Sequence, residues 1–295
     1  MHADDTPDDT PDDAPAATPL ATPIDARQAA ALLGTAAWLD VRDEASFASG
    51  HLPGAGNVPL QDWTERRHEL PPPRDGVIAI ADDAAHAREA AQQLATFGYR
   101  DVAWLDAPWR SMGVAASREP AKPLWRPAPF LERVLPAIPR GGTLDVACGA
   151  GRDAVFLARN GFEVEAWDRD TGALARADAL AARNGVHLRT VTVNLEAAVA
   201  PAFAEAKYAL ILCFRYLHRP LFPLLMHALA PGGHLVYETF REGQERYGHP
   251  RRPRFLLYRG ELREAFAALE LLEYEESEPA GGPVMARLHA RKPQH

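Results

Sequence analysis

A glycine-rich turn in the second half of the chain is flanked by two acidic residues whose placement suits a nucleotide-like ligand. The turn is Gly149-Ala150-Gly151, where glycines let the backbone approach a ligand closely. Asp145 lies within the apolar run before the turn, where a buried carboxylate is costly unless it orders the turn or meets a cation. Asp168 ends the next apolar run, where a carboxylate can accept the hydroxyls of a ribose. This pattern predicts a site for a nucleoside-bearing cofactor.

Arg152 follows this turn at the expected start of a helix, where a cation opposes the helix dipole. Two kinds of partner could offset its charge. One is a carboxylate or another anion of a bound ligand, and the other is a salt bridge to Asp153 or a neighbouring acid. The sequence leaves both interpretations open.

A second group of residues could face the reacting end of the ligand. Phe214, Tyr216 and His218 follow the apolar run 208–213, and ligands meet the carboxyl ends of parallel strands. Phe214 could line a substrate pocket, and Tyr216 or His218 could accept a proton. The alternative is structural, with Phe214 in the core and His218 at the start of the next helix.

The segment 241–257 is long and contains five arginines interleaved with aromatic side chains. Long loops inside compact domains are usually functional, and this composition suits an anionic or aromatic substrate. Arg241, Tyr247 and Arg254 are therefore candidate substrate-binding residues. The alternative is a solvated lid whose arginines pair with acids of the same segment and elsewhere.

A sheet of parallel strands is needed to bring these residues together, and the second half alternates strands and helices in the way that builds one. The pattern is typical of a doubly wound, seven-stranded α/β fold of the Rossmann type. Strands are expected near 143–147, 162–167, 188–193, 208–213, 233–240, 270–276 and 284–291, and helices near 130–137, 152–160, 171–184, 219–230 and 259–268.

The first half has a smaller α/β pattern with its own parallel sheet. Strands are expected at 36–41, 77–80 and 102–105, and an amphipathic helix at 84–97 ends before a glycine. Residues 1–22 repeat proline, acid and small residues, which predicts a disordered acidic tail. The four prolines of 118–129 predict a linker between domains at 23–117 and 130–292.

Composition narrows the class of protein. The chain has 295 residues, of which 47% are hydrophobic and 24% charged, and this suffices for two cores. We expect a cytoplasmic protein without a membrane partner, because no apolar run approaches the roughly 18 residues of a spanning helix and the start is Asp-rich. Two cysteines exclude a disulfide framework, and we expect no metal. Six tail aspartates supply most of the net charge of −8, so the remainder demands no polyanionic partner.

Residues 50–55, Gly-His-Leu-Pro-Gly-Ala, resemble the rhodanese-like family, and the resemblance extends over the first domain. Active members place a nucleophilic cysteine after the strand matched here by 77–80 and an arginine at the end of the following loop. Ala81 and His86 stand at those positions, and two aspartates between them would repel an anionic sulfur donor. Because sulfur transfer needs a thiolate, we expect this domain to be catalytically inactive.

Residues 124–292 resemble the class I S-adenosylmethionine-dependent methyltransferases, through the glycine turn, the acid after the second strand and the Pro-Gly-Gly turn at 231–233. The Gly-Arg-Asp-Ala sequence at 151–154 is similar to bacterial members of the tellurite-resistance and thiopurine groups. The resemblance implies S-adenosylmethionine as the cofactor. Carried over by position, the cofactor-binding residues are Asp145, Gly149, Gly151 and Arg152 toward the methionine end, Asp168 at the ribose, and Asn194 and Leu195 at the adenine. Many members have Asp at position 194, but an amide can still donate or accept there.

The chain is therefore expected to be a methyltransferase that acts on a small-molecule acceptor, with an inactive rhodanese-like domain attached. The Asn/Asp-Pro-Pro-aromatic sequence of amino-nitrogen nucleobase methylation is absent after 208–213, and nucleic acid is the less favoured acceptor. One alternative is a tRNA methyltransferase that uses the arginine-rich loop 241–254 to hold the RNA backbone. The other is a non-catalytic two-domain scaffold. The sequence does not give the acceptor or the oligomeric state.

Overall fold

The computed structural model describes residues 21–197 and 203–294, and the chain divides into two units between Leu124 and Trp125. Most of the acidic tail predicted at 1–22 lies outside the described residues, and Thr22 begins the first strand. Both units are α/β structures built on a parallel or mostly parallel sheet, which confirms the predicted fold class.

The first unit has a five-stranded sheet in the order β1-β5-β4-β2-β3, with every neighbouring pair parallel. Its strands are β1 (Thr22–Ile24), β2 (Ala37–Asp40), β3 (Gly56–Asn57), β4 (Val77–Ile80) and β5 (Val102–Leu105). Its helices are α1 (Ala26–Ala31), α2 (Glu44–Ser49), α3 (Trp63–Arg66) and α4 (Ala84–Thr96), with short 3-10 turns at Leu60–Asp62, Arg67–Glu69 and Trp109–Met112.

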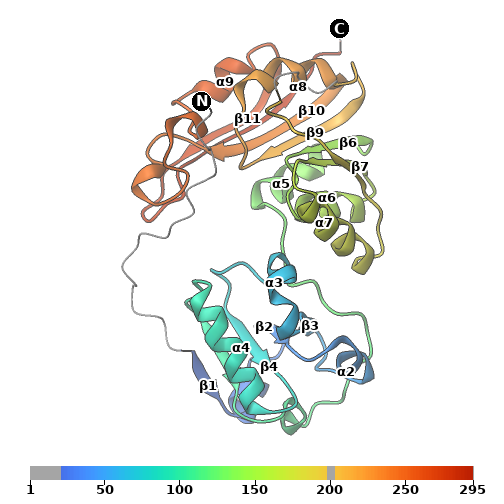
Figure 1. Cartoon of the computed structure of the whole chain (residues 1–295), viewed down its shortest axis with the longest axis vertical. Helices are drawn as coiled ribbons and strands as arrows, with labels where there is room; N and C mark the ends of the chain where they lie inside the picture. The colour runs from blue at the N-terminus through green and yellow to red at the C-terminus, as the bar shows by residue number, and fades with distance from the viewer. Residues whose placement is uncertain (1–20, 198–202, 295) are drawn as a thin grey trace, which may run out of the picture. The chain divides into compact units, whose positions relative to one another are not determined.

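The central strand β4 is buried along its whole length, as expected for a parallel strand covered on both faces. The helix that follows it, α4, begins where the Asp83 side chain accepts the backbone N–H of His86. The helix lies against the sheet (Figure 1), and its buried residues are four alanines and Leu94. The chain leaves the helix through Gly98 at φ 89°, which confirms the predicted helix and its end.

The segment predicted as a linker, 118–129, contributes side chains to both units. Lys122 donates its backbone N–H to the carbonyl of Ala55 at 3.0 Å, and Leu124 is buried in the core of the first unit. Trp125 is buried against Val155 in the second unit. The change from one core to the other therefore takes place across a single peptide bond.

The second unit has a seven-stranded sheet in the order β11-β12-β10-β9-β6-β7-β8, in which β12 runs antiparallel to both of its neighbours. Its strands are β6 (Gly142–Val146), β7 (Glu163–Asp168), β8 (Arg189–Thr192), β9 (Tyr208–Phe214), β10 (Leu229–Phe240), β11 (Glu270–Ser277) and β12 (Met285–Arg291). Its helices are α5 (Pro129–Val134), α6 (Arg152–Arg159), α7 (Thr171–Arg183), α8 (Phe222–Ala228) and α9 (Glu261–Ala265), and its 3-10 turns are Leu135–Ala137, Arg219–Leu221, Gln244–Arg246 and Pro253–Phe255. These strands and helices confirm the predicted doubly wound pattern.

Two apolar layers cover the two faces of this sheet. One layer joins α5 and α6 to the sheet through a cluster that includes Phe130, Leu157 and Leu212, and α7 packs beside α6 (Figure 1). The other layer joins α8 and α9 to the opposite face through residues such as Phe222 and Phe266. Among the described residues, no helix combines the length and the apolar composition that crossing a bilayer requires.

The parallel strands β6, β7, β8, β9 and β10 all end at the same edge of the sheet. Neighbouring strands are in register there, with Val146 beside both Trp167 and Cys213. The segments that follow these strands therefore share one edge, which we call the carboxyl edge. It carries the glycine turn, Asp168 and the residues after β9.

Candidate cofactor site

The glycine turn follows β6 in an unusual run of left-handed backbone conformations. Ala147, Gly149 and Gly151 have φ values of 58°, 55° and 76°. The turn is held by two backbone hydrogen bonds, from Cys148 N–H to the carbonyl of Trp167 and from Gly151 N–H to the carbonyl of Cys148, each of 3.0 Å. The alanine is the costly member of this run, because a side chain disfavours this region of φ.

The two glycines of the turn have different surroundings. A Cβ added to Gly149 would meet no atom within 4 Å, so open space lies in front of it. A Cβ added to Gly151 would lie 2.6 Å from the Cβ of Ala177 and 3.1 Å from its Cα. Gly151 therefore lets α6 and α7 approach each other, whereas Gly149 leaves room where a ligand could approach the backbone.

Asp168 connects the end of β7 to the glycine turn. Its Oδ2 accepts the backbone N–H of Gly149 at 2.8 Å, and its Oδ1 accepts the N–H of Asp170 at 3.0 Å. Each carboxylate oxygen can accept more than one hydrogen bond, so these two contacts leave capacity for a ligand hydroxyl. The two contacts also fix the direction in which the carboxylate points.

Asp145 is buried in β6, with only 3% of its surface exposed, beside the first turn of α6. Its Oδ2 has no hydrogen-bond partner within the part of the chain that the structure describes. Burial raises the pKa of Asp145 well above its usual range, and the charges of Asp153 and Asp168 raise it further. A cation in front of this carboxylate would reverse that shift, because it would favour the ionised form.

Arg152 and Asp153 begin α6. Asp153 accepts the backbone N–H of Ala128 at 2.7 Å, which fixes the entry of the chain into α5. Burial raises the pKa of Asp153, while that hydrogen bond and the charges of Arg152 and Arg215 oppose the rise. Arg152 thus lies close enough to Asp153 for electrostatic attraction, and this is one of the two partners that the sequence left open.

Asn194 and Leu195 follow β8, at the far side of Asp168 from the glycine turn. Leu195 is buried in the same apolar cluster as Trp167 and Phe203, whose ring centroids are 5.0 Å apart. Asn194 is exposed, and its Oδ1 accepts the backbone N–H of Glu196 at 3.0 Å. The apolar side chain of Leu195 could contact the face of a planar ring, and the amide of Asn194 could form hydrogen bonds with polar atoms at the edge of the ring.

The segment after β9 is held in place from several sides. Tyr237 is buried in β10 and donates its hydroxyl proton to the carbonyl of Tyr216 at 2.9 Å. The carbonyl of His218 accepts the backbone N–H of Leu221 at 3.0 Å. Phe214 is half-buried against the apolar layer below α5 and α6. Hydrogen bonds thus hold the backbone of Tyr216 and His218 in place, and their half-buried side chains extend from it.

The Tyr216 hydroxyl donates a hydrogen bond to Glu196 Oε1, with 3.4 Å between the oxygens. Burial raises the pKa of Tyr216, and the negative charge of Glu196 raises it further. The phenol therefore stays protonated at neutral pH, and it can donate a hydrogen bond more readily than it can accept a proton.

Two of the arginines in the segment 241–257 are paired with Glu278. Arg241 is only 5% exposed, and its Nη2 donates to Glu278 Oε2 at 3.1 Å, while Arg246 also pairs with Glu278. Tyr247 and Arg254 are exposed, and the Arg254 guanidinium lies over the Phe255 ring, 4.6 Å from its centroid. Arg241 therefore anchors the segment at the end of β11. The exposed Tyr247 and Arg254 lie farther along the segment.

The two cysteines lie near the ends of neighbouring strands, as the sequence predicts. Burial raises the pKa of Cys213 to about 12 and raises that of Cys148 as well, with a contribution from Asp145 in both cases. Both thiols therefore stay protonated at neutral pH. A protonated thiol is a poor nucleophile and metal ligand, which supports a packing role for the buried Cys213 and the half-buried Cys148.

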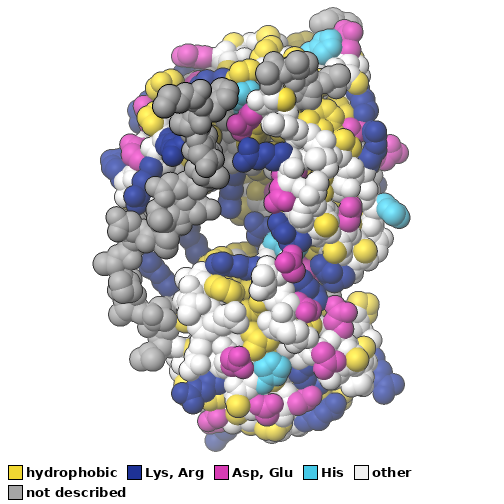
Figure 2. All heavy atoms as spheres, in the orientation of Figure 1, with side chains coloured by type: hydrophobic (Ala, Val, Ile, Leu, Met, Phe, Trp, Pro, Cys, Tyr) yellow, Lys and Arg dark blue, Asp and Glu magenta, His cyan; other side chains and the backbone are white. Residues whose placement is uncertain are grey.

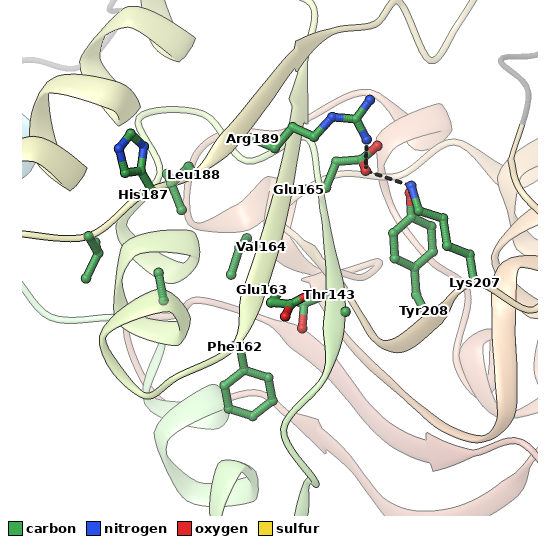
Figure 3. A pocket seen from close by; sticks show the side chains of 13 residues that line it. Thr143, Phe162, Glu163, Val164, Glu165, His187, Leu188, Arg189, Lys207 and Tyr208 are labelled. Carbon is green, nitrogen blue, oxygen red and sulfur yellow. Dashed lines mark hydrogen bonds and ion pairs between the residues drawn. The ribbon is translucent and has the colours of Figure 1, made fainter.

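A groove at the opposite edge of the sheet is lined by the first residues of β6, β7, β8 and β9. Figure 3 shows its charged cluster, in which Oε2 of Glu165 forms ion pairs with Nη1 of Arg189 at 2.6 Å and with Nζ of Lys207 at 2.7 Å. Trp167 also donates its indole N–H to Glu165. The groove therefore lies at the amino ends of the strands, away from the glycine turn and Asp168.

In the first unit, the loop after β4 contains no group able to carry sulfur. Ala81 is fully buried, and its carbonyl accepts the backbone N–H of Trp109. Asp82 pairs with Arg42 at 3.1 Å, and Asp83 caps α4. The acids thus neutralise an arginine and the helix start, the two features that would otherwise attract an anion.

The different surroundings of the two glycines lead to a test of stability. Replacing Gly151 with alanine forces a Cβ against the backbone of α7 and strains φ, so we expect the free energy of unfolding to fall by about 2–4 kcal/mol. Gly149→Ala adds a Cβ to open space, so its free energy of unfolding should fall only by the cost of a left-handed φ, about 1 kcal/mol. Urea unfolding of both variants gives the comparison. Equal losses would contradict the assignment of Gly151 to helix packing.

Comparisons with known proteins agree with this division of the chain. Residues 25–111 match the model of the rhodanese-like domain, and residues 143–233 match the model of a methyltransferase domain. The chain is similar to the uncharacterized protein UNK4.09 of Schizosaccharomyces pombe, with 24% identity over 75% of this chain and 82% of that one.

Among solved structures, it is similar to TehB from Haemophilus influenzae, with 20% identity and a TM-score of 0.46 over 55% of this chain and 61% of that chain. It is also similar to the N-methyltransferase NodS of Bradyrhizobium japonicum in complex with S-adenosyl-L-homocysteine, with 22% identity and a TM-score of 0.43 over 56% and 84% of the two chains. The family models show that this chain joins a rhodanese-like domain to a methyltransferase domain.

Proposed function

We propose that the chain transfers a methyl group from S-adenosylmethionine to a small-molecule acceptor at the carboxyl edge of the second unit. The observation that carries this proposal is the open space in front of Gly149, a residue that follows the buried Asp145 in the chain and donates its N–H to the carboxylate of Asp168. A ligand with a cationic end and a ribose suits this arrangement, because Oδ2 of Asp145 has no hydrogen-bond partner among the described residues and the carboxylate of Asp168 has acceptor capacity left.

S-adenosylmethionine, when bound, supplies a methyl group on a positively charged sulfur, which becomes a neutral thioether as the acceptor's lone pair bonds to the methyl carbon. Asp145 would hold the positive methionine end, and Asp168 would accept hydrogen bonds from the ribose. Leu195 and Asn194 would contact the adenine. Because the leaving group is already good, the protein mainly needs to position the acceptor in line and exclude water.

The acceptor would lie near the segment after β9. Tyr216 would donate a hydrogen bond to it, since the raised pKa of its phenol keeps the proton on the hydroxyl at neutral pH. His218 is then the candidate base for an acceptor that carries a proton, and Phe214 would line the pocket. An RNA acceptor is less favoured, because Arg241 and Arg246 are paired with Glu278 and charges of both signs are mixed over the face seen in Figure 2.

We also propose a cytoplasmic location. Cys148 and Cys213 are both free, which suits a reducing compartment.

Replacing one carboxylate oxygen of Asp168 tests the placement of the ribose. Asp168→Asn should weaken the binding of S-adenosylhomocysteine by about 10- to 100-fold, because charge-assisted hydrogen bonds to the ribose are lost. Glu163→Gln makes the same chemical change at the other end of β7 and should leave the affinity unchanged. Calorimetric titration measures both. Equal affinities for the two variants would reject the role of Asp168, and no binding by the unaltered chain would favour the non-catalytic scaffold.

The rhodanese-like domain is proposed to be inactive in sulfur transfer, since Ala81 cannot carry a persulfide. The full chain, mixed with thiosulfate and cyanide, should form thiocyanate no faster than an unrelated protein does. The ferric-thiocyanate colour reaction measures this rate. Turnover clearly above that background would overturn the assignment of this domain to packing or binding.

A further inference from the structure

Arg215 is the first residue after β9, and its backbone adopts a conformation that arginine rarely takes. Its φ is 54°, in the left-handed region that costs residues with a side chain on the order of 1 kcal/mol or more. The backbone is held there by a 2.7 Å hydrogen bond from the Arg215 N–H to the carbonyl of Glu238 in β10. Such strain persists only where surrounding contacts fix it, and it is common at ligand-binding sites.

The side chain of Arg215 is exposed at the carboxyl edge. No hydrogen bond or ion pair joins its guanidinium to another side chain within residues 21–197 and 203–294, unlike the guanidinium of Arg219, which is held by Glu261. Arg215 lies near enough to Asp153 to oppose the rise in the pKa of that acid. Since β9 pairs with β6, Arg215 lies at the same edge of the sheet as the glycine turn that follows β6.

The acids around Arg215 are already engaged. Glu238 is 5% exposed and pairs with Arg287 of β12. Asp153 accepts the backbone N–H of Ala128, and burial favours its neutral form. Neither acid provides a close ion pair for Arg215, so an exposed positive charge lies at the edge of the sheet that carries the proposed site.

We propose that Arg215 binds an anionic group of the methyl acceptor, so that the acceptor carries a carboxylate, a phosphate or another oxyanion. The planar guanidinium can donate two parallel hydrogen bonds to such a group, and the backbone from which it extends is held in place by Glu238. This inference rests on the proposed methyltransferase activity and deepens it. The methionine carboxylate of the cofactor is the competing partner for Arg215, and the experiment below separates the two.

Arg215→Gly is the informative variant, because glycine adopts the same φ without strain while the guanidinium is lost. The fold should therefore survive the change. Two matched controls are available. Ala206→Gly relaxes another left-handed residue, at φ 50°, before β9, and Arg189→Ala removes an arginine from the opposite edge of the sheet.

The assay uses methyl-tritiated S-adenosylmethionine with a small-metabolite extract separated by anion exchange at neutral pH. We expect label transfer only with fractions retained on the resin. For Arg215→Gly, the amount of active fraction needed for half-maximal transfer should rise by about 10- to 100-fold, while S-adenosylhomocysteine affinity stays unchanged and thermal stability does not fall. Both controls should behave like the unaltered chain.

Three results would overturn the inference. Label transferred to an unretained fraction would show an acceptor without negative charge. Unchanged transfer by Arg215→Gly would show that Arg215 does not bind the acceptor. Loss of S-adenosylhomocysteine affinity in that variant would assign Arg215 to the cofactor. Failure of the proposed function looks different, because the unaltered chain would then label no fraction at all, and the inference would fall with it.

Discussion

The hydrogen bond from the Gly149 N–H to Asp168 is the contact on which the candidate site depends. It joins the turn after β6 to the end of β7, and it orients a carboxylate whose remaining acceptor capacity faces outward. The turn can donate this bond because glycine tolerates the left-handed conformation that the turn requires. The same contact therefore sets the shape of the turn and the direction of the acid, so that a ligand would meet both in fixed positions.

Backbone strain marks the same edge of the sheet. Ala147 and Arg215 follow two adjacent strands, β6 and β9, and both adopt left-handed conformations despite their side chains. Each is fixed by the sheet itself, through the strand that precedes it and a backbone contact nearby. Strain of this kind must be offset by the packing of the rest of the domain, and the two apolar layers around the sheet provide that packing. A site placed on such a scaffold needs little reorganisation when a ligand binds.

Much of the fold could be predicted from the sequence, because the apolar strands of a parallel sheet and the helices between them have distinct periods. The expected strand at 143–147 is β6 at Gly142–Val146, and the expected helix at 84–97 is α4. The positions of the glycine turn and of Asp168 at one edge also follow from the order of strands. The left-handed conformation of Arg215 gives no such signal, because nothing in its residue type indicates it. Contacts between residues distant in the sequence could not be predicted either. Arg241 is anchored by Glu278, 37 residues away, and Asp153 accepts the backbone N–H of Ala128.

The open space in front of Gly149, beside Asp168, is where we expect S-adenosylmethionine to bind. The most direct measurement is a crystal structure of the full chain grown with S-adenosylhomocysteine. We expect electron density for the ligand in front of Gly149, with ribose hydroxyls within hydrogen-bond distance of Asp168 and the amino group toward Asp145. Density for the ligand at another place, or side chains of the protein filling that space at saturating ligand, would contradict it.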